Sequence, residues 1–153
     1  MLKNADYNII AKFYDKVIGG HNDLQEYILE KISRYNENAE SILELGCGTG
    51  KNLENLQSRF EITGIDISGE MLKIAKKKIP GGKFYPGDIR AFDLGKKFDV
   101  IICMYDTVNH LILFNEWKKL FRNVNEHLSE NGIFIFDVNT IYKLKNLLEI
   151  SPL

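Results

Sequence analysis

Residues 46–50 have the sequence GCGTG and form the stretch of the chain best suited to hold a ligand. Glycine has no Cβ, so a loop of this composition lets a ligand approach the backbone closely. A helix expected to begin near Lys51 would offer unpaired N–H groups and the positive end of its dipole to an anionic or polar group. Glycine loops are common, and the dinucleotide fingerprint needs its third glycine one position later, where this chain has Lys51.

Three carboxylates lie at or just beyond the ends of three expected strands and limit the kinds of ligand that the site could bind. Glu44 lies two residues before Gly46, Asp66 lies 20 residues after Gly46, and Asp88 follows the third strand. A carboxylate in the position of Asp66 accepts hydrogen bonds from both ribose hydroxyls. Asp88 is placed to accept from the exocyclic amine of a purine, and Glu44 would repel a pyrophosphate but attract a cation. With no phosphate-binding Lys or Arg beside them, these residues indicate a nucleoside that carries positive charge.

Alternating strands and helices must position these residues. The spacing of apolar residues predicts strands over 41–45, 61–65, 83–85, 98–104 and 133–138. It predicts helices over 7–18, 22–36, 51–58, 114–128 and 140–150, and one that Ser68 caps and that stops before Pro80. Strands joined by helices of such length form right-handed crossovers. The sequence therefore predicts a doubly wound α/β domain with its ligand beyond the carboxyl ends of the strands.

Composition excludes several classes of protein. The 153 residues suit one domain, and 20 basic against 21 acidic residues give a net charge of -1. This balance argues against a dedicated binder of nucleic acid or membrane surfaces. Two cysteines, Cys47 and Cys103, are too few for a disulfide framework and have no metal-ligand spacing, so we expect small apolar fillers and no metal. Without a signal peptide or a long apolar run, the expected location is cytoplasmic.

These features together resemble the class I S-adenosylmethionine-dependent methyltransferases. The segments that carry the resemblance are ILELGCGTG (42–50), GIDISGEML (64–72), GDI (87–89), FDVIICMYDTVNHL (98–111) and GIFIFDVNT (132–140). The resemblance covers roughly residues 7–140 and implies S-adenosylmethionine as cofactor and S-adenosylhomocysteine as product. It also implies a Rossmann-like, mostly parallel sheet with five strands in the order 3-2-1-4-5, which lacks the last two strands of the seven-stranded family fold.

The resemblance implies a role for each matching residue. The methionine part of the cofactor would contact Glu44, directly or through water, and the loop residues Gly46, Cys47, Gly48 and Gly50. Asp66 would bind the ribose, and Asp88 the adenine amine. The adenine ring would lie beside Ile67, Met71 and Ile89. Met104 and Tyr105 would border the methionine amino group and the transferred methyl group.

A second matching segment, AKFYD (11–15) followed by Gly19, resembles the segment of small-molecule methyltransferases in which a helix closes over the cofactor and Tyr14 approaches the methyl group. The motif of enzymes that methylate DNA bases is not matched, because positions 106–109 have the sequence DTVN. We therefore expect methyl transfer to a nitrogen or oxygen of a small molecule, and no DNA. Tyr14 or His110 would assist loss of the acceptor's proton, although such residues are as often simply packed.

The expected organisation is one domain over 1–153, with helices over 1–38 that close the site, a core over 39–140 and a C-terminal helix or tail over 141–153. The apolar fifth strand would lie exposed at the sheet edge and favour self-association. Residues 140–150 could cover this strand, a partner could cover it, or the chain could be a fragment. The alternative to an active enzyme is a catalytically silent cofactor-binding module or truncated remnant. The glycine spacing and Glu44 disfavour a nicotinamide dehydrogenase.

Overall fold

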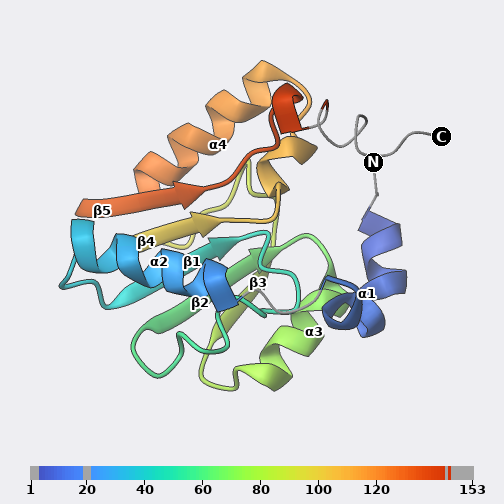
Figure 1. The fold of residues 1–153 in the computed structure, drawn as a ribbon, viewed down its shortest axis with the longest axis horizontal. Coiled ribbons are helices and arrows are strands. Elements are labelled where there is room, and N and C mark those ends of the chain that lie inside the picture. Colours follow the sequence, from blue (N-terminus) through green and yellow to red (C-terminus); the bar gives the residue numbers. More distant parts are fainter. Residues whose placement is uncertain (1–3, 19–21, 144, 146–153) are drawn as a thin grey trace.

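Five short apolar segments form a parallel sheet at the centre of the computed structural model, which describes residues 4–18, 22–143 and 145. The strands are β1 (Ser41–Leu45), β2 (Glu61–Asp66), β3 (Lys83–Pro86), β4 (Phe98–Cys103) and β5 (Leu128–Phe136). They lie in the order β3-β2-β1-β4-β5, and each neighbouring pair is parallel (Figure 1). This confirms the expected doubly wound fold and its strand order.

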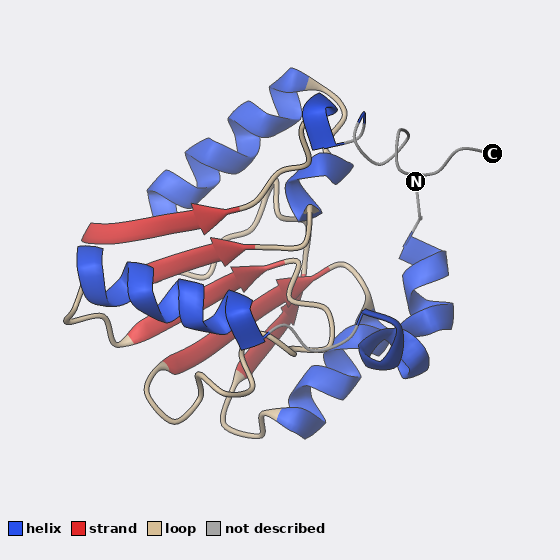
Figure 2. Ribbon diagram, in the orientation of Figure 1, coloured by secondary structure: helices blue, strands red, loops and turns tan. Residues whose placement is uncertain are grey.

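Helices cover both faces of the sheet. They are needed there because successive apolar side chains of β1 point to opposite faces. Ile42 packs on one face with α2 (Asn22–Tyr35) and α3 (Gly69–Lys78), whereas Leu43 packs on the other with α4 (Phe114–His127). Figure 2 shows α2 lying across the sheet. Both side chains are fully buried, and each such burial contributes about 1.5–3 kcal/mol to stability. The central strands therefore form a rigid base for the loops at their carboxyl ends.

The first helix, α1 (Asn4–Ile18), lies beyond the carboxyl ends of the strands and packs beside α3 (Figure 1). The helix that the sequence predicts over 7–18 is thus confirmed, but its apolar residues divide between two faces. Ile9, Phe13 and Val17 are 75%, 62% and 78% exposed, while Ala11 is buried. Because α1 covers the carboxyl ends of the strands rather than a face of the sheet, it buries little apolar surface.

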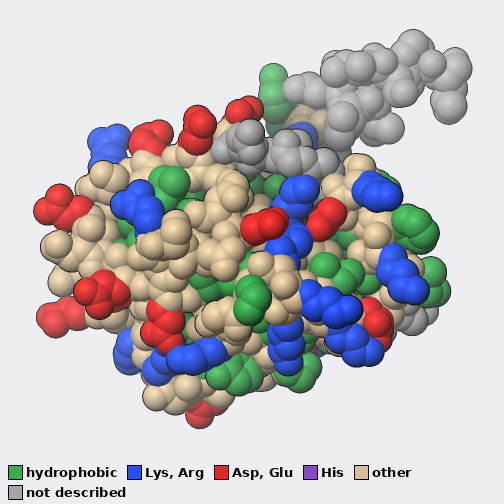
Figure 3. All heavy atoms as spheres, turned by 90° about the horizontal axis from the view of Figure 1, so that it is seen from below, with side chains coloured by type: hydrophobic (Ala, Val, Ile, Leu, Met, Phe, Trp, Pro, Cys, Tyr) green, Lys and Arg blue, Asp and Glu red, His purple; other side chains and the backbone are tan. Residues whose placement is uncertain are grey.

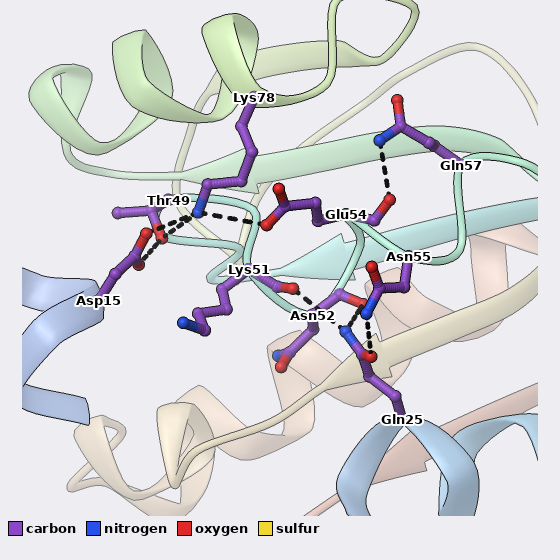
Figure 4. Close-up of polar contacts among 9 residues, drawn as sticks. All are labelled: Asp15, Gln25, Thr49, Lys51, Asn52, Glu54, Asn55, Gln57 and Lys78. Atoms are coloured by element: carbon purple, nitrogen blue, oxygen red, sulfur yellow. Dashed lines mark hydrogen bonds and ion pairs between the residues drawn. The ribbon is translucent and has the colours of Figure 1, made fainter. Parts of the chain in front are cut away.

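The helix expected over 51–58 is not formed, and residues 51–59 make a run of turns instead. The side-chain amide of Gln25 donates to the carbonyl oxygens of Lys51 and Asn52, at 3.3 Å in each case (Figure 4). In a helix those carbonyls would accept from backbone N–H groups four residues later. The expectation of a helix dipole behind the glycine loop was therefore wrong.

The last elements also differ from the expected boundaries. β5 begins at Leu128, directly after α4, and ends at Phe136 rather than at residue 138. The pair Asn131-Gly132, which resembles a turn in the sequence, lies inside this strand. A register shift opposite Phe98–Val100 accommodates the extra residues. Of the helix expected over 140–150, residues 141–143 and 145 are helical and the rest lie outside the described residues.

Charged side chains of both signs are interspersed on the face shown in Figure 3. The four lysines of α3, at positions 73 and 76–78, do not share one environment. Lys73 is exposed and pairs with Glu70 on the same helix, whereas Lys78 is only 15% exposed and pairs with Asp15 of α1.

None of the described helices has the length and apolar character needed to cross a bilayer.

We expect self-association through β5, which forms one edge of the sheet and is paired on one side only among the described strands. Unpaired backbone groups on an apolar edge strand are a template for pairing with a second chain. The aromatic rings of Phe121, Phe134 and Phe136 are packed together beside this edge. Sedimentation velocity at tens of micromolar should show oligomers, which Phe136→Lys disperses and Ile112→Lys, exposed elsewhere, does not. A single sharp monomer of the unaltered chain would contradict this expectation.

Candidate functional site

A cavity of about 310 Å³ opens beyond the carboxyl ends of the strands. Its walls come from α1, from the loops after β1, β2 and β3, and from the loop after β4. The predicted site residues that line the cavity are Tyr14, Gly46, Gly48, Asp66, Ile67, Met71, Asp88, Ile89, Tyr105 and His110. The fold thus brings together residues from each predicted motif except the segment 132–140, which contributes none to the lining.

The glycine loop is shaped by backbone geometry at Gly46 and Gly48, whose φ angles are +71° and +52°. Residues that carry a side chain rarely adopt this left-handed region, so glycine is strongly favoured there. The N–H groups of Gly46 and Cys47 donate to the carbonyl oxygen of Ile65 at 2.8 and 2.9 Å. A Cβ at Gly46 would lie 2.5 Å from Thr107 Cγ2. Hydrogen bonds therefore hold the loop against β2, and its residues Gly46 and Gly48 face the cavity.

Asp66, the last residue of β2, holds this loop in place. Its Oδ2 accepts from the backbone N–H of Gly48, and its Oδ1 accepts from that of Ser68, both at 2.8 Å. Burial raises the pKa of Asp66, and these backbone hydrogen bonds oppose the increase. Each carboxylate oxygen has a second lone pair, so Asp66 can still accept hydrogen bonds from a ligand in the cavity.

Glu44 is a buried carboxyl group behind the glycine loop. Its Oε1 accepts from Asn52 Nδ2 at 2.6 Å, whereas its Oε2 has no hydrogen-bond partner among the described residues. Burial raises the pKa of Glu44 to about 8, although the bond from Asn52 opposes this. Such a buried, unsatisfied oxygen is costly unless a ligand relieves it. Glu44 does not line the cavity itself; burial, and to a smaller extent the ionised form of Glu44, raises the pKa values of Tyr14 and Tyr105, which do line it.

Asp88 lines the cavity but is already bound to Arg90, a residue that the sequence motifs did not single out. Both carboxylate oxygens accept from the guanidinium group, with Nε at 2.9 Å from each, and Oδ1 also accepts from the Arg90 backbone N–H. The hydrogen bond from Arg90 lowers the pKa of Asp88. Arg90 in turn contacts Glu116 of α4. Asp88 is therefore an ionised acceptor with a fixed orientation.

Two rings of α1 and the ring of His110, from the loop after β4, meet on the α1 side of the cavity. The hydroxyl oxygen of Tyr7 lies 3.1 Å from His110 Nε2, and the rings of Tyr7 and Tyr14 pack edge to face. Burial, followed by the neighbouring Tyr7, raises the pKa of Tyr14 to about 12. Tyr14 is therefore a neutral hydrogen-bond donor near pH 7. Tyr7 was not predicted, yet it lies two helical turns before Tyr14 and so on the same face.

The loop after β4 is held in a strained conformation. Tyr105 and Asp106 have φ angles of 56° and 50°, which are uncommon for residues other than glycine. The carboxylate of Asp137, just beyond β5, accepts from both of their backbone N–H groups, at 3.1 and 2.8 Å. Asp137 thereby stabilises the turn that carries Thr107 and His110 to the cavity.

The remaining predicted residues lie beside the cavity rather than in its lining. Cys47 and Met104 are buried in the hydrophobic core on the α2 and α3 side of the sheet, and Cys103 is buried on the opposite side. Gly50 has a φ of +73°, and a Cβ there would lie 3.2 Å from that of Ala75. The two cysteines thus fill the core, as expected of small apolar residues, and the side chain of Met104 is also packed in the core beside the cavity.

Comparison with known proteins places this geometry in a family. Residues 42–132 match a family model described as a methyltransferase domain. The crystal structure of an S-adenosylmethionine-dependent methyltransferase from Clostridium acetobutylicum is 37% identical, with a TM-score of 0.82, and the match covers 93% of this chain and 61% of that one.

Curated relatives include enzymes with different acceptors. The dTDP-3-amino-3,6-dideoxy-alpha-D-glucopyranose N,N-dimethyltransferase of Streptomyces fradiae is 30% identical over 140 residues, 87% of this chain and 54% of that protein. The malonyl-acyl-carrier-protein O-methyltransferase of Bacillus anthracis is 35% identical over 137 residues, 85% of this chain and 49% of that protein. The chain thus spans about half the length of these two relatives.

The residues of the site fit the cofactor of this family. The unpaired Oε2 of Glu44 suits a nearby cationic group, the backbone at Gly48 is open to the cavity, and Asp66 keeps the capacity to accept from hydroxyl groups. The match to the family model extends over the segment that contains these three residues. The chain belongs to the methyltransferase domain family, within the class I methyltransferases that use S-adenosylmethionine.

Proposed function

We propose that this protein transfers a methyl group from S-adenosylmethionine to a nitrogen or oxygen of a small molecule. The observation that carries the proposal is the convergence of Gly46, Gly48 and Asp66 on one cavity at the carboxyl edge of the sheet, with Glu44 behind them. The cofactor supplies an electrophilic methyl group on a positively charged sulfur. The chain supplies binding, orientation and exclusion of water.

The nucleoside half of the site would be formed by β2, β3 and the loops that follow them. Asp66 would accept from the ribose hydroxyls with the lone pairs that Gly48 and Ser68 leave free. Ile67, which is 54% exposed in the cavity wall, offers apolar surface to the adenine ring together with Met71 and Ile89. Asp88, oriented by Arg90, would accept from the adenine amine.

The methionine half would lie against the glycine loop, with Glu44 behind it. An ammonium or sulfonium charge near Glu44 would favour the ionised form of this carboxyl group, which burial disfavours in the protein alone. Tyr14 and Tyr105 would border the methyl group. Tyr14 acts there as a neutral hydrogen-bond donor, because its raised pKa keeps the hydroxyl protonated.

The acceptor would enter on the side of α1 and the loop after β4. His110 would take the acceptor's proton, and the hydrogen bond to Tyr7 would hold its ring in place. Tyr14 would orient the acceptor rather than remove its proton. The amino-sugar N,N-dimethyltransferase among the relatives supports a small-molecule acceptor with a nucleophilic nitrogen. The malonyl-acyl-carrier-protein O-methyltransferase supports an oxygen nucleophile, although its name gives a carrier-bound acceptor.

A second candidate function is a cofactor-binding module that does not turn over by itself. It is compatible with the same cavity, because the residues that line the cavity account for cofactor binding whether or not an acceptor is methylated. Both functions require cofactor binding, and they differ in methyl transfer. A screen of small amines and alcohols with S-adenosylmethionine labelled in its methyl group separates them, because only the first function yields labelled product from this chain alone.

Cofactor binding can be measured directly by calorimetry with S-adenosylhomocysteine. The unaltered protein should bind with micromolar affinity, and Asp66→Ala should weaken binding by roughly ten- to a hundredfold, since it removes charged hydrogen-bond acceptors. Glu130→Ala, which removes an exposed carboxylate outside the cavity, should bind as the unaltered protein does. If a well-folded unaltered chain shows no binding, the proposed function is wrong.

Glu44 should give the protein a distinctive pH dependence. Between the ordinary carboxyl pKa of 4.5 and about 8, the folded chain retains a proton on Glu44 that the unfolded chain has released. This group therefore makes the free energy of unfolding decrease as pH rises through that range. Thermal denaturation of Glu44→Gln should show a flatter profile over the same range. Equal slopes for the two proteins would contradict the burial of an ionisable Glu44.

A ligand cation should expel the same proton. Near pH 7 the free protein holds Glu44 largely protonated, and a bound ammonium group would favour the ionised form. Calorimetry of S-adenosylhomocysteine in buffers of different ionisation enthalpy should detect the release of close to one proton. Glu44→Gln should abolish this release, and an undiminished release would assign it to another group.

A further inference from the structure

α1 is attached to the rest of the protein mainly by polar contacts at three points. Tyr7 contacts His110, and Asn8 Oδ1 accepts from Ser68 Oγ at 2.6 Å. The third point is Asp15, which contacts both the glycine loop and α3. The segments that α1 contacts, which are the loop after β4, the residue after Ile67, the glycine loop and α3, all include or adjoin residues that line the cavity.

Apolar burial contributes little to this attachment. Among the α1 side chains that the structure describes, Ala11 alone is buried, while Ile9, Phe13 and Val17 are exposed. A helix with few buried apolar contacts opens at low free energy compared with the core. The polar contacts must therefore decide how firmly α1 stays over the cavity.

Asp15 makes the most extensive of these contacts. Its Oδ1 accepts from Thr49 Oγ1 in the glycine loop, and its Oδ2 lies 2.7 Å from Lys78 Nζ of α3 (Figure 4). Lys78 also lies 3.4 Å from Thr49 Oγ1 and 4.0 Å from Glu54 Oε2. One carboxylate therefore joins α1, the cofactor loop and α3.

This ion pair differs from the other lysine contacts of α3. Thr49 is 1% exposed and Lys78 15% exposed, whereas Lys73 is 69% exposed in its pair with Glu70. Exposed pairs contribute little because water screens them. Partial burial strengthens the contacts of Asp15. Because Asp15 directly follows Tyr14 in α1, these contacts also hold the Tyr14 ring in the cavity wall.

We propose that Asp15 is a positioning residue, which holds α1 closed over the cofactor cavity through Thr49 and Lys78 and so slows release of the cofactor. The inference rests on the proposed function, because it concerns the same cavity. Asp15 itself does not line that cavity, so its effect on the ligand is exerted through Tyr7 and Tyr14 on the same helix.

The test is the rate at which S-adenosylhomocysteine leaves the full chain, measured by stopped-flow. Asp15→Ala should release it roughly tenfold faster, since a charged hydrogen-bond network is lost. Alanine has the highest helix propensity, so the change does not weaken α1 as a helix. Lys16→Gln, an exposed neighbour on α1, is the matched control and should release the ligand at the original rate.

Thr49 supplies a second, independent pair of variants. Thr49→Val removes the hydroxyl donor to Asp15 at nearly constant volume and should speed release, whereas Thr49→Ser keeps the donor and should restore slow release. Hydrogen exchange of α1 amides in the ligand-free protein should increase in Asp15→Ala and Thr49→Val while global unfolding changes little. A merely structural role would alter stability and release together and would not distinguish the serine from the valine variant.

The outcomes separate the two proposals. Binding by the unaltered chain, with the original release rate in Asp15→Ala and Thr49→Val, overturns the role of Asp15 and leaves the proposed function intact. If the unaltered chain binds no S-adenosylhomocysteine, the proposed function fails and this inference fails with it. Faster release in both variants, together with the serine rescue, supports the inference.

Discussion

The carboxylate of Asp66 is the contact on which the geometry of the site depends. By accepting from the backbone N–H groups of Gly48 and Ser68, it fixes the glycine loop on one side and the start of α3 on the other. β2 can hold Asp66 in place because parallel strands pair on both of its sides. The buried sheet thereby holds in place a loop that has no regular secondary structure of its own.

Two carboxyl groups, the half-buried Asp66 in the cavity wall and the fully buried Glu44 behind it, differ in how their oxygens are satisfied. Asp66 is stabilised by backbone hydrogen bonds, whereas one oxygen of Glu44 has no partner among the described residues. The protein thus keeps an unsatisfied acceptor behind its ligand cavity, at a cost to its own stability. Burial raises the pKa of Glu44 for the same reason, and a nearby cationic group would favour its ionised form.

The parts that surround the cofactor cavity differ in how firmly they are held. The sheet and its facing helices are held by buried apolar side chains, but α1 is held by polar contacts at Tyr7, Asn8 and Asp15. Polar contacts between partly exposed groups break more readily than a packed core. A wall of this kind can open for a ligand while the loop and the strand ends keep their positions.

Sequence alone determined the fold class, the glycine loop and the acidic residues Glu44, Asp66 and Asp88, because hydrophobic periodicity and motif spacing are local properties. The strand order followed from the resemblance to the class I methyltransferases, and the structure confirms it. The tertiary structure decided which of them reach the cavity. Contacts between segments far apart in the chain explain the differences: Gln25 binds the carbonyl oxygens of Lys51 and Asn52 where a helix was expected, Arg90 connects the Asp88 loop to Glu116 of α4, and Lys78 of α3 pairs with Asp15 of α1. No periodicity encodes such side-chain partners, since they exist only once the chain has folded.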